Sequence, residues 1–192
     1  MAMKPLSARR ARTRERLIDA ASQVIGEKGL EGATLDEIAT RAGLTKGAIY
    51  DNFESKDDLI LAVIMAKAAQ PRRPQFQPAG TLKEHLRQMG QVVADFLPAA
   101  EAQAGPSAQL DLYALTHDSM RAKLSGFYSA RIAQTEIMMT ELAKEHALPL
   151  PPAQFAVLLS VLAAGLVQHR LMTPHLVPDE FILQAFESLA PD

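Results

Sequence analysis

Residues 34–53 decide the fold and read Thr-Leu-Asp-Glu-Ile-Ala-Thr-Arg-Ala-Gly-Leu-Thr-Lys-Gly-Ala-Ile-Tyr-Asp-Asn-Phe. Thr34 and Glu37 have the spacing of a capping box, which predicts the start of a short helix. Gly43 ends that helix and supplies the positive φ that a tight turn needs, and Thr45 begins a second short helix. Two short helices joined in this way indicate a helix-turn-helix, with its motif at about residues 33–53.

The two short helices share an apolar face and leave a polar one. The apolar residues expected to pack together are Leu35, Ile38, Leu44, Ile49 and Phe53. The residues left exposed on the second helix are Thr45, Lys46, Gly47, Tyr50 and Asp51. Short polar and basic groups at the N-terminal end of such a helix are typical of a surface that reads base edges. A plain helical hairpin is the alternative, because short helices with a glycine turn are common in all-α proteins.

The rest of the chain also has helical periodicity, with no convincing strand-like alternation. We expect an all-α fold of about nine helices. The expected helices cover residues 9–28, 34–41, 45–53, 55–69, 81–97, 108–117, 119–146, 153–172 and 179–189. Residues 70–80 contain three prolines and predict a connector, and residues 99–107 predict a loop. The chain therefore divides into a three-helix DNA-binding head within 9–69 and a helical body over 70–192.

Charge is distributed unevenly along the chain. The formal net charge is −2. Residues 1–16 nevertheless carry six basic side chains and one acidic one, and residues 74–192 carry seven basic and twelve acidic ones. A basic head on an acidic body indicates an anion-binding surface at one end of the chain.

Composition argues against several classes of function. The chain has no cysteine, which removes disulfides and thiolate metal sites and suits a cytoplasmic location. Neither a secretory signal nor an apolar run of about 20 residues is apparent, so we expect no membrane span. Motifs of nucleophilic, metal-dependent or nucleotide-dependent enzymes are also missing, so we expect a protein that is not an enzyme and that holds no metal and no cofactor.

The residues around the motif resemble the TetR family of bacterial transcriptional regulators over about residues 12–66. The resemblance rests on residues 16–21, 27–29, 33–34, 38–39, 42–47, 49–50, 53 and 55–59, with undisturbed spacing. It implies that Thr34 contacts a phosphate, that Thr45, Lys46 and Gly47 enter the major groove, and that Tyr50 and Lys56 hold the DNA backbone. Lys46 would address guanine, and Thr45 a thymine methyl group. Asp51 departs from the aromatic or basic residue that is common at its position.

The arginine-rich start of the chain has two interpretations. Arg9 and Arg12 belong either to an arm that reaches phosphates or the minor groove, or to a solvated stretch that attracts DNA without specificity. We favour the arm.

The last two expected helices are unusually apolar. The stretch 153–167 has polar side chains only at Gln154 and Ser160, so it must be buried on two sides. The resemblance implies that these helices pair with their copies in a homodimer. The interface residues expected on this basis are Val157, Val161, Ala164, Gly165, Phe181 and Phe186. The core of a monomer is the alternative.

The central helices carry methionine, aromatic and histidine side chains that predict a site for a small-molecule effector. The candidates are Met89, Phe96, Tyr113, His117, Phe127, Met138 and His169. Ordinary core packing is the alternative for each of them. We therefore predict a homodimeric repressor that binds a palindromic DNA operator and is released by a small molecule. A helical ligand-binding or adaptor protein without specific DNA binding is the competing hypothesis.

Overall fold

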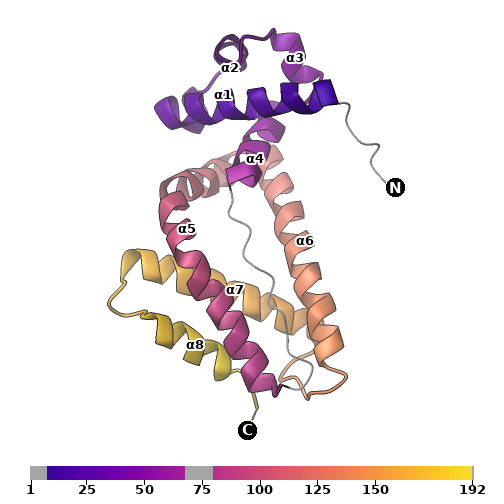
Figure 1. Ribbon diagram of the computed structural model, residues 1–192, viewed down its shortest axis with the longest axis vertical. Coiled ribbons are helices and arrows are strands. Elements are labelled where there is room, and N and C mark those ends of the chain that lie inside the picture. Colours follow the sequence, from indigo (N-terminus) through magenta and orange to yellow (C-terminus); the bar gives the residue numbers. More distant parts are fainter. Residues whose placement is uncertain (1–7, 68–79, 192) are drawn as a thin grey trace. The chain divides into compact units, whose positions relative to one another are not determined.

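The computed structural model describes residues 8–67 and 80–191, and every regular element within these ranges is a helix (Figure 1). The elements are α1 (Ala8–Gly32), α2 (Leu35–Arg41), α3 (Lys46–Tyr50), α4 (Lys56–Lys67), α5 (Leu82–Thr116), α6 (Asp118–Leu142), α7 (Pro152–Met172) and α8 (Asp179–Glu187). Gly29 interrupts α1 with a φ of 74°. The prediction of an all-α fold is confirmed. When the two parts of α1 are counted separately, the number of helices in the described ranges agrees with the expectation of about nine.

Helix α5 differs from its prediction, because it continues through residues 99–107, where we expected a loop. Pro98 and Pro106 each remove one backbone hydrogen bond from a helix, but they do not end this one. Between the prolines, residues 99–104 read Ala-Ala-Glu-Ala-Gln-Ala and are strong helix formers, which explains why helix persists despite the one glycine that follows them, Gly105. Apart from Gly80, the expected connector at 70–80 lies outside the described residues.

Contacts divide the chain into two compact units. Unit 1 comprises Met1–Ala68 and Gly105–Leu124, and unit 2 comprises Ala69–Ala104 and Ser125–Asp192. Unit 1 is thus larger than the head expected at 9–69. It gains the end of α5 and the start of α6, because buried residues there, such as Tyr113 and Met120, form one apolar cluster with Ile60 of α4.

The main core of unit 1 joins its first four helices. Leu17 and Val24 of α1 and Ile38 of α2 are almost fully buried in it. Of the predicted shared apolar face, Ile49 and Phe53 are also buried, while Leu35 and Leu44 pack against the cluster from its edge. The helical periodicity therefore predicted the packing of the two short helices correctly.

A second set of contacts in unit 1 is polar. The buried carboxylate of Asp57, at the start of α4, accepts a hydrogen bond of 3.2 Å from the Tyr113 hydroxyl group and another from Ser119. Beside it, Lys123 Nζ lies 2.6 Å from Asp58 Oδ1. These bonds fasten α4 to the end of α5 and the start of α6.

Unit 2 is built from α7, α8 and the parts of α5 and α6 that lie outside unit 1. Phe155 of α7 and Phe186 of α8 are at the centre of its core. Gly90 allows α8 to approach α5 closely, because a Cβ atom at Gly90 would lie 3.1 Å from Leu183 Cα. Outside this contact, Arg87 Nη1 of α5 donates a 2.6 Å hydrogen bond to Glu187 Oε1 of α8.

Helix α7 is longer than the apolar stretch 153–167 that it contains. It has 21 residues and a mean hydropathy of 1.6, so by length and composition alone it is the one helix in the described ranges that could cross a membrane. One side of α7, including Phe155, Leu159 and Leu166, is buried in unit 2, and the opposite side is exposed.

Candidate nucleic-acid interface

The first part of the motif is organised by the cap of α2. Thr34 Oγ1 accepts a hydrogen bond of 3.3 Å from the backbone N–H of Glu37, as the capping box predicted. The Glu37 carboxylate is drawn to Lys28 of α1, whose Nζ atom lies 2.8 Å from Glu37 Oε1. Thr34 itself is exposed at the N-terminus of α2, which suits a phosphate contact.

The turn between α2 and α3 depends on Gly43, whose φ is 63°. The backbone N–H of Leu44 donates a 2.9 Å hydrogen bond to the carbonyl oxygen of Ala39, which closes the end of α2. Arg16 of α1 reinforces this turn, because its Nη2 atom donates a 2.6 Å hydrogen bond to the carbonyl oxygen of Ala42. The direction in which α3 leaves the turn is thus held from α1.

Helix α3 has five residues and is capped by Thr45, whose Oγ1 atom accepts a 3.3 Å hydrogen bond from the backbone N–H of Ala48. Ile49 is fully buried and anchors α3 in the core of unit 1. The side away from this anchor is exposed, including Gly47 and Tyr50, whose side chain is 56% accessible to solvent. The structure therefore presents one exposed polar surface at the start of α3.

Lys46 lies at this surface together with an acidic residue of α2. Its Nζ atom is 2.9 Å from Asp36 Oδ2, and both side chains remain substantially exposed. The hydrogen bond that Lys46 donates to Asp36 raises the pKa of Lys46 above its ordinary value, so the ammonium group stays charged at neutral pH. Sequence reasoning missed Asp36, because its pairing with Lys46 spans the turn and has no local signature.

Two arginines of α1 hold the other end of α3. Arg10 Nη2 donates a 2.7 Å hydrogen bond to the carbonyl oxygen of Asp51, and Arg14 Nη1 donates a 3.0 Å hydrogen bond to that of Asn52. The Arg14 guanidinium also lies 4.2 Å from the centre of the Phe53 ring. Cations are favourable at the C-terminal end of a helix, where carbonyl groups lack partners. The i, i+4 spacing of these arginines was a signal that they share one face of α1.

The remaining predicted DNA contacts have different environments. Arg9 and Arg12 are exposed in the first turns of α1, so this part of the arginine-rich start is helical. Lys56 Nζ lies 3.5 Å from the carbonyl oxygen of Glu31 and is partly buried. The exposed residues of the motif are thus Thr34, Thr45, Lys46, Gly47 and Tyr50. Lys56 differs from them because it also contacts α1.

The first helices of the chain include a capped pair joined by a glycine turn, and the third helix presents a short exposed surface with a charged lysine. These features define a helix-turn-helix DNA-binding domain. The comparison with known families agrees, since residues 17–63 match the family of bacterial regulatory proteins, tetR family. This domain belongs to the TetR family.

Curated relatives share this domain with the chain. The HTH-type transcriptional regulator SrpR of Pseudomonas putida is 44% identical over 66 residues, which are 34% of this chain and 30% of SrpR. The HTH-type transcriptional repressor BepR of Brucella suis biovar 1 (strain 1330) is 47% identical over 62 residues, which are 32% of this chain and 30% of BepR. The matched segment thus spans less than a third of each of these regulators, neither of which is named as an enzyme.

Similarity of fold extends over nearly the whole chain. The structure of NalD, the secondary repressor of the MexAB-OprM multidrug efflux pump in Pseudomonas aeruginosa, is similar with a TM-score of 0.61. The match covers 95% of this chain and 99% of NalD, with 21% sequence identity. The chain therefore shares the all-α fold of that protein at low sequence identity.

The seven predicted effector-site residues are distributed over the two units. Tyr113 and His117 belong to unit 1, where their rings stack with centroids 3.8 Å apart. Met89 and Met138 pack against the core of unit 2, and His169 is exposed on α7. Two others, Phe96 and Phe127, are partly buried in the unit 2 segments of α5 and α6.

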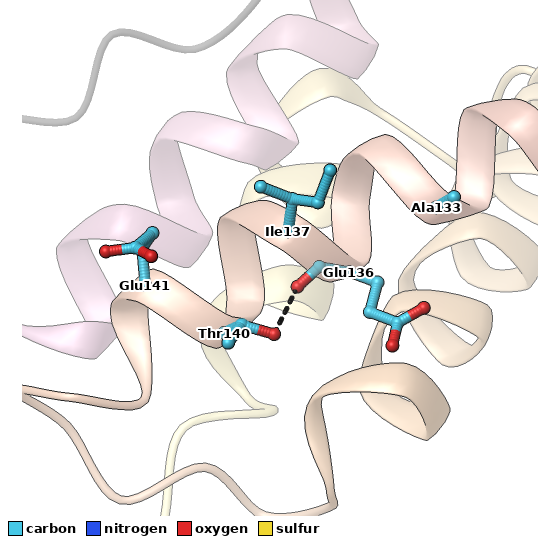
Figure 2. A pocket seen from close by; sticks show the side chains of 5 residues that line it. All are labelled: Ala133, Glu136, Ile137, Thr140 and Glu141. Atoms are coloured by element: carbon cyan, nitrogen blue, oxygen red, sulfur yellow. Dashed lines mark hydrogen bonds between the residues drawn. The ribbon is translucent and has the colours of Figure 1, made fainter.

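The hollows near α6 and α8 are formed by other residues. One of 350 Å³ is lined only by side chains of α6, namely Ala133, Glu136, Ile137, Thr140 and Glu141 (Figure 2). A second of 720 Å³ lies between Thr81–Lys83, Glu145–Ala147 and the end of the chain near Pro191. Neither includes any of the seven predicted residues. A hollow lined by a single helix is a surface feature rather than an enclosed ligand site.

Most of the predicted dimer-interface residues are exposed on α7 and α8. Val157, Val161 and Phe181 have exposed fractions of 46%, 64% and 47%. Ala164 and Gly165 are exposed on α7 as well. Phe186 is different, because it is only 1% exposed and packs in the core of unit 2. Phe186 therefore contributes to the core of unit 2 and is not exposed for contact with a second copy of the chain.

Proposed function

We propose that this chain is a transcriptional repressor that binds a palindromic DNA operator as a homodimer and is released by a small-molecule effector in the bacterial cytoplasm. The observation that carries the proposal is the exposed surface of α3 at Thr45, Lys46, Gly47 and Tyr50. An exposed second helix of a helix-turn-helix enters the major groove with its N-terminal residues against the base edges. Phosphate contacts around it set its register.

DNA binding by this surface is supported by its chemistry. The ammonium group of Lys46 can donate to the O6 and N7 atoms of guanine, and the methyl group of Thr45 can contact a thymine methyl group. Around these residues, Thr34, Tyr50, Arg9 and Arg12 are exposed and can contact phosphates. Base contacts would provide the sequence preference and phosphate contacts most of the affinity.

The homodimer is supported by the exposed apolar surface of α7 and α8. Val157, Val161 and Phe181 would be unfavourably hydrated in an isolated chain, and their burial against a second copy would remove that cost. Ala164 and Gly165 have small side chains, which allow two helices to approach closely. Two copies would present two α3 helices to successive major grooves, which requires half-sites roughly 34–36 Å apart.

Release by an effector requires a ligand that distinguishes two arrangements of the dimer. Repression follows the name of the relative BepR, while the relative FasR is named an activator, so the sign of regulation is decided by a reporter gene. A ligand that binds one arrangement of the dimer more tightly than the other shifts the dimer toward that arrangement. The change in the free energy of DNA binding is limited by the difference between the ligand's binding free energies for the two arrangements. Coupling of about 1–3 kcal/mol would be enough for control.

The test is the selection of DNA duplexes from a randomised pool by the purified full chain. Selected duplexes are then compared with scrambled duplexes of equal length by fluorescence anisotropy over a range of KCl concentrations. We expect a palindromic consensus and an affinity that falls steeply with salt because of counterion release. A folded chain that enriches no sequence at low salt contradicts the proposal and favours an adaptor without specific DNA binding. A reporter gene under the selected duplex then tests repression.

A further inference from the structure

An acidic residue at a DNA-binding surface requires an explanation. Asp36 lies beside the exposed start of α3, and its side chain is 71% accessible to solvent. A carboxylate in this position repels phosphates and lowers affinity for every DNA sequence. Its ion pair with Lys46 is exposed as well, and pairs of this kind contribute little to the stability of a fold. An acid in the first turn of α2 also favours the helix, but Glu37 provides the same effect, so the property that distinguishes Asp36 is its pairing with Lys46 across the turn.

The backbone of Asp36 has a well-defined position. The carbonyl group of the same residue accepts a 2.8 Å hydrogen bond from Thr40 Oγ1 within α2. Helix α2 is in turn anchored by Ile38 and Ala39, which are buried in the core of unit 1. Asp36 thus carries its carboxylate on a short side chain from a supported helix, while the side chain of Lys46 has four rotatable carbon–carbon bonds before its ammonium group.

The pairing restricts where the Lys46 ammonium group can go. An unrestrained lysine is a flexible point charge that can reach phosphates as easily as base edges. With its Nζ atom 2.9 Å from Asp36 Oδ2, Lys46 stays at the start of α3 and uses one of its three N–H donors. Two donors remain for the adjacent O6 and N7 acceptors of a guanine.

We propose that Asp36 is a specificity-determining positioning residue, which confines Lys46 to base recognition. This inference rests on the proposed DNA-binding function. Asp36 lowers affinity for non-specific DNA more than for the operator. The ratio of the two affinities, rather than the affinity for the operator alone, is the property that it improves.

The experiment compares Asp36→Asn with Glu37→Gln in the full-length chain. Both substitutions remove one negative charge from the first turn of α2, but Glu37 pairs with Lys28 and not with Lys46. Dissociation constants are measured by anisotropy for the duplex selected by the wild-type chain and for its scrambled counterpart, over several KCl concentrations. Urea unfolding of each variant establishes that it is folded.

For Asp36→Asn we expect tighter binding of scrambled DNA and a selected-to-scrambled affinity ratio that falls about fivefold or more. The salt dependence on scrambled DNA should become steeper by about one released counterion, because the freed lysine finds a phosphate. Glu37→Gln should change both affinities alike and keep their ratio. Asp36→Glu retains a carboxylate and should restore most of the ratio.

A double-mutant cycle identifies the residue through which Asp36 acts. In a Lys46→Met background, Asp36→Asn should leave the affinity ratio unchanged, because no ammonium group is left to position. An unchanged ratio in the single Asp36→Asn variant, or a decrease that persists without Lys46, overturns the inference. These results would leave the proposed function intact, whereas a wild-type chain that selects no duplex contradicts the proposed function itself.

Discussion

Arg16 of α1 and Ala42 are joined by a 2.6 Å hydrogen bond from the guanidinium group to the carbonyl oxygen, directly before the glycine of the turn. A Cβ atom on Gly43 would lie 3.3 Å from the same guanidinium group. A side chain at position 43 would therefore crowd the guanidinium group that donates this hydrogen bond. Because Ala42 is buried, its carbonyl oxygen gains from having a charged donor.

Replacing Arg16 by alanine should lower the free energy of unfolding by about 1 kcal/mol, because the Ala42 carbonyl oxygen loses its donor. Urea unfolding followed by circular dichroism measures this change. Arg12→Ala is the matched control, since Arg12 is exposed on the same helix. It should change stability by less than about 0.5 kcal/mol. Equal stability of the two variants would contradict a structural role for Arg16.

Lys46→Ala and Tyr50→Phe should separate base recognition from backbone contact. Lys46→Ala should reduce the preference for the selected duplex about fivefold or more, because a base contact is lost. Tyr50→Phe removes one hydroxyl group and should weaken selected and scrambled duplexes by a similar factor, roughly two- to tenfold. Anisotropy titrations with both duplexes measure these ratios. If neither variant alters binding, the exposed surface of α3 is not the DNA-binding surface.

Val161→Glu should convert the proposed dimer into monomers, because two buried carboxylates would face each other across the α7 interface. Ile137→Glu on α6 is the matched control, with an original side chain that is 61% exposed compared with 64% for Val161. It should leave the dimer intact. Sedimentation velocity gives the mass of each variant. A monomeric wild-type chain, or a dimer that survives Val161→Glu, contradicts the proposed interface.

Tyr113 should make stability sensitive to alkaline pH. Burial and the nearby Asp57 carboxylate raise the pKa of Tyr113 to about 12. The phenol of the unfolded chain ionises near pH 10. Between these values the unfolded state binds fewer protons than the folded state, so stability falls as pH rises. The wild-type chain should lose on the order of 1–3 kcal/mol more than Tyr113→Phe over this range.

Urea unfolding at a series of pH values measures this difference. Tyr50→Phe serves as the control, because it removes a phenol hydroxyl group at an exposed position. Tyr113→Phe should also be less stable by about 1 kcal/mol at neutral pH, since Asp57 loses a donor. Parallel pH profiles for the wild-type chain and Tyr113→Phe would contradict the assigned environment of Tyr113.

The motif was predictable because its signals are local. Thr34 and Thr45 cap the helices that follow them, and Gly43 takes a positive φ, as their residue types indicate. Ile38 and Ile49 are buried, as helical periodicity predicts. The loop expected at 99–107 was wrong for a related reason, since alanine-rich sequence favours helix strongly enough to continue between two prolines.

The body was harder to interpret, because apolar residues have the same pattern in a core, a ligand site and an interface. Phe181 and Phe186 lie on one short helix, yet one is half exposed and the other is buried. Tyr113 was expected in an effector site, but its hydroxyl group donates to Asp57 inside unit 1. Which neighbour a side chain meets depends on the path of distant segments, and a local pattern contains no information on that path.

The amino-acid sequence by itself determined the helical class, the capped pair of short helices with its glycine turn, and the concentration of positive charge near the N-terminus. Each depends on residues within one or two turns of each other, where backbone preference and helical spacing dominate. Only the tertiary structure decided that Asp36 holds Lys46, that Arg10, Arg14 and Arg16 brace α3 and its turn, and that 105–124 packs with the first four helices. These contacts join segments that are far apart in the chain, so they form only when the core brings those segments together.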